Sequence, residues 1–293
     1  MSALFLVVIG VLLVGYPWIS NWYYGQQVQS EVKVYERQMQ RESSEDTRKQ
    51  WEQAKKYNEL SVKSAVALTD TFLEREDTSE ELLNRLYEET LCMRDDGLMC
   101  FVEIPRIHVY LPVYHGTSEQ VLRRGAGHLQ SSAFPIGENN CRAVISAHSG
   151  FGASKMFSDL TEMEKGDVFY IHVLDQRLMY RVCEIQVIWP EDTDQLAPEQ
   201  GRDLVSLLTC TPYGINTQRL VVTGERVQKN LGEQIADNVN ERNESGQVQS
   251  NWMRNYKRAL LWGTGIIVLT ISVRKIWKGA ASKKKLIQKG KKS

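Results

Sequence analysis

A series of short apolar segments between residues 101 and 226 constrains the fold of this 293-residue chain more than any other feature. The segments are rich in β-branched and aromatic residues, and turn residues separate them, which is the pattern of strands joined by short loops. They fall at residues 102–104, 109–113, 143–147, 168–173, 179–189, 204–209 and 220–224. Seven or eight short strands at this spacing predict a mainly β fold, either a closed barrel or a sandwich.

The last two segments, 204–209 and 220–224, enclose a tight loop that contains proline and glycine. Cys210 stands where the first of these strands ends, and Arg219 stands where the second begins. If the strands are neighbours, both side chains emerge at the same end of the sheet, where a fixed positive charge favours the nucleophilic thiolate. The alternative is a half-buried core cysteine beside a surface arginine, since free cysteines are commonly buried.

His148 is the histidine best placed to act as a base in this arrangement. It is one of five histidines, and it follows the strand 143–147 and precedes Ser149, so it also lies where a strand opens into a loop. His108 and His172 sit within apolar segments, where a structural role is the simpler interpretation. A thiol, a base and a fixed cation at strand ends are the groups that nucleophilic cysteine catalysis requires.

Three stretches of the chain, in the same order, resemble the sortase family and specifically its class C, pilin-polymerising members. The nucleophile signature of that family is similar to SLLTCTPYGINTQRLVVTG around Cys210. Its histidine segment is similar to SAHSGFGASKMFSDL at residues 146–160, and the opening of its barrel to EIPRIHVYLPVYHGTSEQVLRRGAGHLQSSAFPIG at 103–137. The resemblance covers residues 100–227. Three positions outside the candidate catalytic set depart from residues common in the family: Ser149, Ser206 and Gln218.

The resemblance implies a closed sortase-type β-barrel of seven to eight strands and assigns the catalytic roles. Cys210 would attack a backbone carbonyl of an LPXTG-like sorting signal, which is cut between Thr and Gly through a thioacyl intermediate. Arg219 would stabilise the oxyanion or hold the peptide, and His148 would transfer the proton. Thr209 and Thr211 are the expected substrate-binding residues.

The expected partners follow from the same resemblance. They are pilin or surface-protein substrates with LPXTG-like signals, a lysine amine acceptor on a pilin, and the membrane; no cofactor is implied. One alternative is a sortase that anchors surface proteins to a cell-wall peptide by the same chemistry. The other is a non-enzymatic extracytoplasmic scaffold in which Cys210 is incidental, so that Cys210→Ala would leave its function intact.

Residues 61–99 are expected to form a lid and a helical segment beside the barrel. In class C sortases this region carries a DPF- or DPW-like motif whose acidic and aromatic residues occupy the active-site cleft. Asp70 and Phe72 match that motif, and Thr71 replaces its proline. The resemblance implies that Asp70 pairs with the catalytic arginine and that Phe72 covers the thiol, whereas the alternative is an ordinary turn.

Two apolar stretches near the ends of the chain predict a multi-pass membrane protein with both termini inside. Residues 3–19 carry no charge and lead into an aromatic belt, so residues 1–24 are expected to be an uncleaved transmembrane anchor, with a cleaved signal peptide as the alternative. A second transmembrane helix is expected at 259–277, with a buried soluble helix as the alternative. Residues 274–293 hold nine Lys or Arg and no acid, which indicates a basic cytoplasmic tail at 278–293. The catalytic domain would then be extracytoplasmic, as in a Gram-positive type envelope.

The barrel domain is expected at residues 100–228, between a polar stalk helix at 25–60 and a linker at 229–258. Four apolar residues at helical spacing predict that the stalk is a helix leading away from the membrane, with a partner-binding coiled coil as the alternative: Val28, Val32, Tyr35 and Met39.

The five cysteines leave at least one thiol unpaired in a monomer, and Cys210 is the candidate. Cys92 and Cys100 bracket a short loop that a disulfide could close, and Cys183 is expected in the core. The chain has no CxxC or HxxxH spacing, so no metal site is expected. It also has no glycine-rich phosphate loop, and its outer domain has no basic–aromatic patch, which argues against a nucleic-acid partner.

Overall fold

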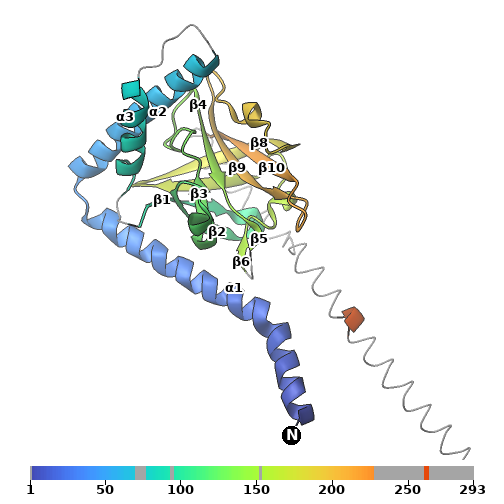
Figure 1. Cartoon of the computed structure of the whole chain (residues 1–293). Coiled ribbons are helices and arrows are strands. Elements are labelled where there is room, and N and C mark those ends of the chain that lie inside the picture. The colour runs from blue at the N-terminus through green and yellow to red at the C-terminus, as the bar shows by residue number, and fades with distance from the viewer. Residues whose placement is uncertain (1, 70–76, 93–95, 152–153, 228–260, 264–293) are drawn as a thin grey trace, which may run out of the picture. The chain divides into compact units, whose positions relative to one another are not determined.

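The computed structural model describes residues 2–69, 77–92, 96–151, 154–227 and 261–263. The chain divides into two units, residues 1–248 and 249–293, and the architecture below is that of the first. At its centre lies a closed barrel of eight strands, preceded along the chain by the helices α1, α2 and α3 (Figure 1). The closed β-barrel expected from the sequence is therefore confirmed.

The eight strands of the barrel are β1 (Leu98–Ile104), β2 (Val109–His115), β3 (Ala126–His128), β4 (Cys141–Ser146), β7 (Val168–Val173), β8 (Gln176–Ile188), β9 (Asp203–Thr211) and β10 (Gln218–Arg226). They close in the order β1-β2-β3-β4-β9-β10-β8-β7. Neighbouring strands are antiparallel except for the β2–β3 and β4–β9 pairs, which are parallel. Parallel pairing requires a crossover, so β4 and β9 come together from distant parts of the chain.

The shorter elements connect these strands. They are η1 (Pro105–Ile107), α4 (Glu119–Arg124), β5 (Ser149–Phe151), β6 (Ser154–Met156), η2 (Leu160–Glu162) and η3 (Thr193–Leu196). The strands β5 and β6 form a separate two-stranded hairpin. The sequence did not predict β3, β5 or β6, because strands of three residues are too short to display alternation.

Alternation along β9 and β10 separates the inside of the barrel from its outer face. Val205 and Leu207 of β9 are fully buried in the barrel core, together with Val222 of β10. Successive side chains of a strand point to opposite faces, so Ser206 and Cys210 of β9 lie on the outer face. The outer face of these strands is therefore where the candidate nucleophile stands.

A buried polar pair lies at the opposite end of β9 from Cys210. The Tyr180 hydroxyl donates to Asp203 Oδ1 at 3.1 Å, and Arg226 Nε lies 4.0 Å from Asp203 Oδ2. Burial raises the pKa of the Asp203 carboxyl to about 7, although the Tyr180 hydrogen bond and the Arg226 charge act in the opposite direction. Gly224 packs against Tyr180 and Phe169, whose rings stack at 5.6 Å.

The predicted stalk is not one helix. Residues 25–60 are divided between α1 (Ser2–Arg41) and α2 (Ser44–Thr69). The break is a helix cap, because the Ser43 hydroxyl accepts a hydrogen bond from the Asp46 amide at 3.1 Å.

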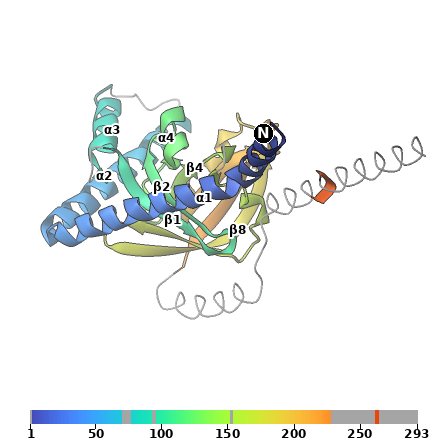
Figure 2. The same cartoon turned by 90° about the horizontal axis from the view of Figure 1, so that it is seen from below.

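The apolar stripe of α1 packs on the barrel. Val28 and Tyr35 are buried, and Tyr35 packs edge-on against Phe101 of β1. The Tyr35 hydroxyl donates to the Met99 carbonyl at 3.4 Å and accepts from the Leu174 amide at 2.9 Å. The helix α1 therefore lies across β1 and β2, as Figure 2 shows, and does not stand apart from the barrel as a free stalk.

An aromatic cluster packs α2 and α3 (Asp77–Glu89) on the barrel. Tyr57 of α2 and Tyr87 of α3 contact Phe134, with ring centroids 4.5 and 5.5 Å apart. The proposed lid residues Asp70 and Phe72 lie between these helices in sequence, outside the described residues.

One expectation about the cysteines is wrong, namely that Cys183 lies in the core. The pairing of Cys92 with Cys100, which the sequence left open, is absent from the structure, because both are thiols. Cys183 is only half-buried and lies outside the core, where its thiol donates to the Thr223 carbonyl at 3.4 Å.

Within the part of the chain that the structure describes, no helix is both long and apolar enough to cross a membrane.

Candidate active site

Cys210 and Arg219 face each other across the β9–β10 pair. They are Cα partners in the antiparallel register, with Thr211 and Gln218 as the next pair toward the loop. Directly opposite residues of antiparallel strands share a face, with Cβ atoms about 4.5–5.5 Å apart. The predicted pairing of a thiol with a fixed positive charge is thus built into the strand register.

His148 reaches the same level from the other side of β9. Parallel pairing of β4 with β9 ends with Ser146 beside Leu208, and the Ala147 amide then donates to the Leu208 carbonyl at 3.1 Å. Continued by two residues past the end of β4, this register would bring His148 beside Cys210. We call His148, Cys210 and Arg219, which the two registers align across the outer face in this way, the Cys210 row.

The side chains of the Cys210 row are partly open to solvent. His148, Cys210 and Arg219 are all of intermediate exposure, in contrast with the fully buried Val205 and Leu207 farther along β9. Cys210 therefore lies at the barrel surface and not in the closed core.

The loop between β9 and β10 fixes the guanidinium of Arg219. Its Nη1 donates to the Asn216 carbonyl at 3.1 Å and to the Gln218 carbonyl at 3.0 Å. A guanidinium carries five N–H donors, so it can hold these two carbonyls and still donate to a substrate oxyanion.

Two contacts hold His148, which lies between the end of β4 and the start of β5. Its Nε2 lies 3.8 Å from Glu119 Oε2, and its carbonyl accepts from the Phe157 amide at 3.1 Å. Glu119 opens α4, and its other oxygen accepts from Arg123 Nε at 3.0 Å. Sequence reasoning missed Glu119, because only the three-dimensional fold brings α4 next to the histidine.

The two predicted substrate-binding threonines differ in their surroundings. Thr209 is buried, and its hydroxyl donates to the Ala147 carbonyl at 2.8 Å, so it ties β9 to the segment that carries His148. Thr211 is half-buried at the end of β9 and lies nearer to the mouth of the site. A contact of either residue with substrate stays a prediction.

This arrangement defines a class of site. A half-exposed thiol flanked by an imidazole and a guanidinium has the groups needed to form and break a thioester: a nucleophile, a proton carrier and an oxyanion partner. No group of three or more His, Cys, Asp or Glu within the described ranges is arranged to hold a metal ion. The fold and site are those of a β-barrel cysteine acyl-transfer enzyme.

Comparison with known proteins agrees with this class. A family model for the sortase domain matches residues 102–227. The chain is 28% identical to sortase D of Bacillus subtilis over 129 residues, which cover 43% of this chain and 62% of that protein. It spans between 51% and 62% of the length of the curated relatives it matches.

Solved structures extend the similarity beyond the barrel. Sortase C1 of Streptococcus agalactiae is 32% identical, with a TM-score of 0.60, and the match covers 68% of this chain and 99% of that one. Sortase C of Clostridium perfringens, crystallised with the C-terminal cell wall sorting motif, is 34% identical with a TM-score of 0.58, over 68% of this chain and 99% of that one. This chain belongs to the sortase family of cysteine transpeptidases, and its neighbours among solved structures are class C sortases.

Proposed function

We propose that this protein is a pilin-polymerising sortase that cleaves an LPXTG-like sorting signal between Thr and Gly. The observation that carries the proposal is the pairing of Cys210 with Arg219 across β9 and β10, and the β4–β9 register, continued past Ser146, supports a place for His148 in the same row. The class C neighbours support the choice of a pilin as substrate.

The reaction proceeds in two balanced steps. The Cys210 thiolate attacks the threonine carbonyl, a thioester forms, the Thr–Gly bond breaks, and the His148 imidazolium gives its proton to the departing glycine amine. A lysine amine of another pilin then attacks the thioester, an isopeptide bond forms, the thiolate leaves, and His148 takes the proton of the amine. Arg219 donates hydrogen bonds to the oxyanion in both steps.

Intact-protein mass spectrometry of the full chain with an LPXTG-like peptide tests this function. We expect a thioacyl adduct on the wild type, with loss of the glycine-containing fragment, and none on Cys210→Ala. Addition of a lysine-bearing pilin domain should discharge the adduct into an isopeptide product. If a panel of sorting-motif peptides gives no adduct on Cys210, the transpeptidase assignment is wrong.

An anchoring sortase is the second candidate, because three of the curated relatives are named sortase A. It shares the first step and differs in the acceptor amine. The same adduct, offered a pilin lysine and a cell-wall peptide amine in equal amounts, identifies the acceptor by the mass of the product.

Membrane attachment is part of the proposal and rests on the sequence. The apolar stretches at residues 3–19 and 259–273 and the basic tail support two spans with the barrel outside. Most of the second stretch lies outside the described residues. Labelling of engineered cysteines on each side of the membrane in intact cells would test this topology.

A further inference from the structure

We propose that a charged cluster of Arg142, Glu199, Arg202 and Glu225 positions the connection between β8 and β9 beside the Cys210 row, where it would contact the bound sorting peptide. We call these four residues the charged clamp. The proposal rests on the proposed function and deepens it, since it names residues that would set how tightly the sorting signal binds.

The outer face beneath the Cys210 row is polar and yet covered. Arg142 of β4, Ser206 of β9 and Thr223 of β10 all lie on this face, and they are only 4%, 0% and 1% exposed. Arg142 Nη1 donates to Ser206 Oγ at 3.1 Å and to Thr223 Oγ1 at 3.4 Å. Side chains outside a barrel are buried only where another segment lies over them.

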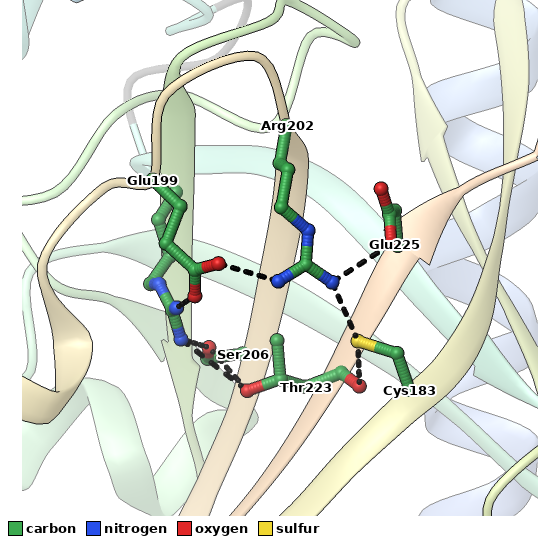
Figure 3. A network of polar contacts seen from close by, with 7 residues as sticks. Cys183, Glu199, Arg202, Ser206, Thr223 and Glu225 are labelled. Atoms are coloured by element: carbon green, nitrogen blue, oxygen red, sulfur yellow. Dashed lines mark hydrogen bonds and ion pairs between the residues drawn. The ribbon is translucent and has the colours of Figure 1, made fainter.

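The covering segment is the connection from Trp189 to Arg202. Its Glu199 carboxylate bridges two guanidiniums, because Oε1 accepts from Arg142 Nη2 at 2.5 Å and Oε2 accepts from Arg202 Nη1. Figure 3 shows Arg202 reaching from the end of the connection toward Glu225 and Cys183 on the neighbouring strands. The distance from Arg202 Nη2 to Glu225 Oε2 is 2.8 Å.

Charge burial makes the bridge strong enough to hold the connection. Burial lowers the pKa of Arg142, and the Glu199 charge opposes that shift. Only the Arg142 side of the pair is buried, at 3% exposure against 40% for Glu199, so removal of Glu199 would leave the buried guanidinium without its counter-charge. Without Glu199, the Arg142 guanidinium would have to recruit water, and the connection would have to lift to admit it.

The strand register links the clamp to the site. The connection begins directly after Ile188, which is the Cα partner of Arg219 in the β8–β10 pair. It ends at Asp203, where the strand that carries Cys210 begins. Thr223 lies four residues along β10 from Arg219, about 13 Å at the rise of a strand. The clamp therefore touches no reacting atom, and its role is to position the connection.

The variant Glu199→Gln removes the bridging charge while keeping the shape of the side chain. We expect the Kd of a fluorescent LPXTG-like peptide to rise about tenfold when this change is made in the full-length Cys210→Ala chain. In the catalytically intact chain, KM should rise by a similar factor while kcat changes less than about threefold. Glu191→Gln, an exposed carboxylate of the same connection, is the matched control and should leave both values unchanged.

Two further measurements keep the proposal open to refutation. The rate of Cys210 alkylation by iodoacetamide should be unchanged in Glu199→Gln, because the thiol and its row are intact. Arg202→Gln retains the Arg142–Glu199 pair and should raise the Kd of the peptide by a smaller factor. If Glu199→Gln does not fold, the Kd of Arg202→Gln tests the proposal in its place. Wild-type peptide affinity in the folded variants, or equal losses in kcat and alkylation rate, would overturn the proposal. Absence of a thioacyl adduct on the wild type would instead overturn the proposed function.

Discussion

The two ends of β9 differ in what surrounds their polar side chains. At the end of the strand, Cys210 is half-exposed on the outer face beside Arg219, and the loop carbonyls hold only part of that guanidinium. At its beginning, Asp203 is 6% exposed and accepts from the hydroxyl of Tyr180, which is itself fully buried. One strand of nine residues thus joins an accessible reactive site to a closed polar core.

This difference indicates that residues needed for activity and residues needed for stability lie at opposite ends of the strand. Groups at the Cys210 end are available to a substrate, so their removal should cost activity and leave folding intact. Groups at the Asp203 end have protein partners only, so changes there should alter the free energy of unfolding and leave the chemistry intact. The predictions below test each half of this separation.

The largest effect is expected from Cys210→Ala. Loss of the nucleophile should reduce transpeptidation at least about 1000-fold, since no other group can carry the acyl chain. The thermal midpoint should stay within a few degrees of the wild type, because the side chain is half-exposed. Cys92→Ala is the control and should keep both the thioacyl adduct and the rate; an adduct on Cys210→Ala would contradict the assignment.

Arg219→Lys should lower kcat about 100-fold or more. A lysine keeps the positive charge but lacks the planar set of donors that can hold the loop carbonyls and an oxyanion together. Steady-state kinetics with the sorting peptide would measure this loss. Arg177→Lys, on β8 and paired with Glu103, is the matched control. Equal rates for Arg219→Lys and the wild type would mean that charge alone suffices.

Gly224→Ala should destabilise the fold by about 1–3 kcal/mol, as overpacking of a core does. A Cβ at this position would lie 2.4 Å from Phe169 Cε1 and 3.0 Å from Tyr180 Cβ, so the ring stack would have to shift. Chemical denaturation measures the change, and the peptide kinetics at low temperature should stay close to wild type. A large drop in kcat without a change in stability would break the comparison.

Asp203→Asn should change how stability depends on pH. The pKa of the folded carboxyl, about 7, lies above its ordinary value of 3.8, so the folded state favours the protonated form. Its contribution to stability is present at low pH and is lost as pH rises through about 7. Between about pH 5 and pH 7 the wild type should lose about 1.4 kcal/mol per pH unit relative to Asp203→Asn.

Denaturation midpoints of the two proteins across this pH range would measure the difference. Buried His128, whose pKa burial lowers to about 3, titrates in both proteins and cancels in the comparison. Asp194→Asn, an exposed carboxylate, is the control and should follow the wild type. Parallel profiles for Asp203→Asn and the wild type would refute the prediction.

Much of the barrel was predictable because its long strands show their pattern locally. The alternation around β8 and the apolar runs that end at Cys210 and begin at Arg219 are properties of neighbouring residues. The short loop between the last two strands also implied their pairing, and hence the proximity of the thiol and the guanidinium.

Other features depend on contacts that no local pattern encodes. No local pattern singles out Glu119 or Arg142, and only the fold brings them to His148 and to Glu199. The helix break at Ser43 follows from a single hydroxyl cap inside a long helical stretch. The place of His148 at the end of a predicted strand singled it out among five histidines, and the resemblance to a family added its expected role.

The parallel pairing of β4 with β9 also determines when the site comes into existence during folding. The Cα partners of this pair are about 62 residues apart in sequence, as Ser146 and Leu208 show. Contacts of such separation form late, because the entropy of loop closure opposes them until other structure exists. In a nascent or partly folded chain, Cys210 can already lie near Arg219 through the local hairpin, but it lacks its imidazole. On the proposed mechanism, complete reactivity would then be a property of the finished barrel, and an unfinished chain would be protected from premature acylation.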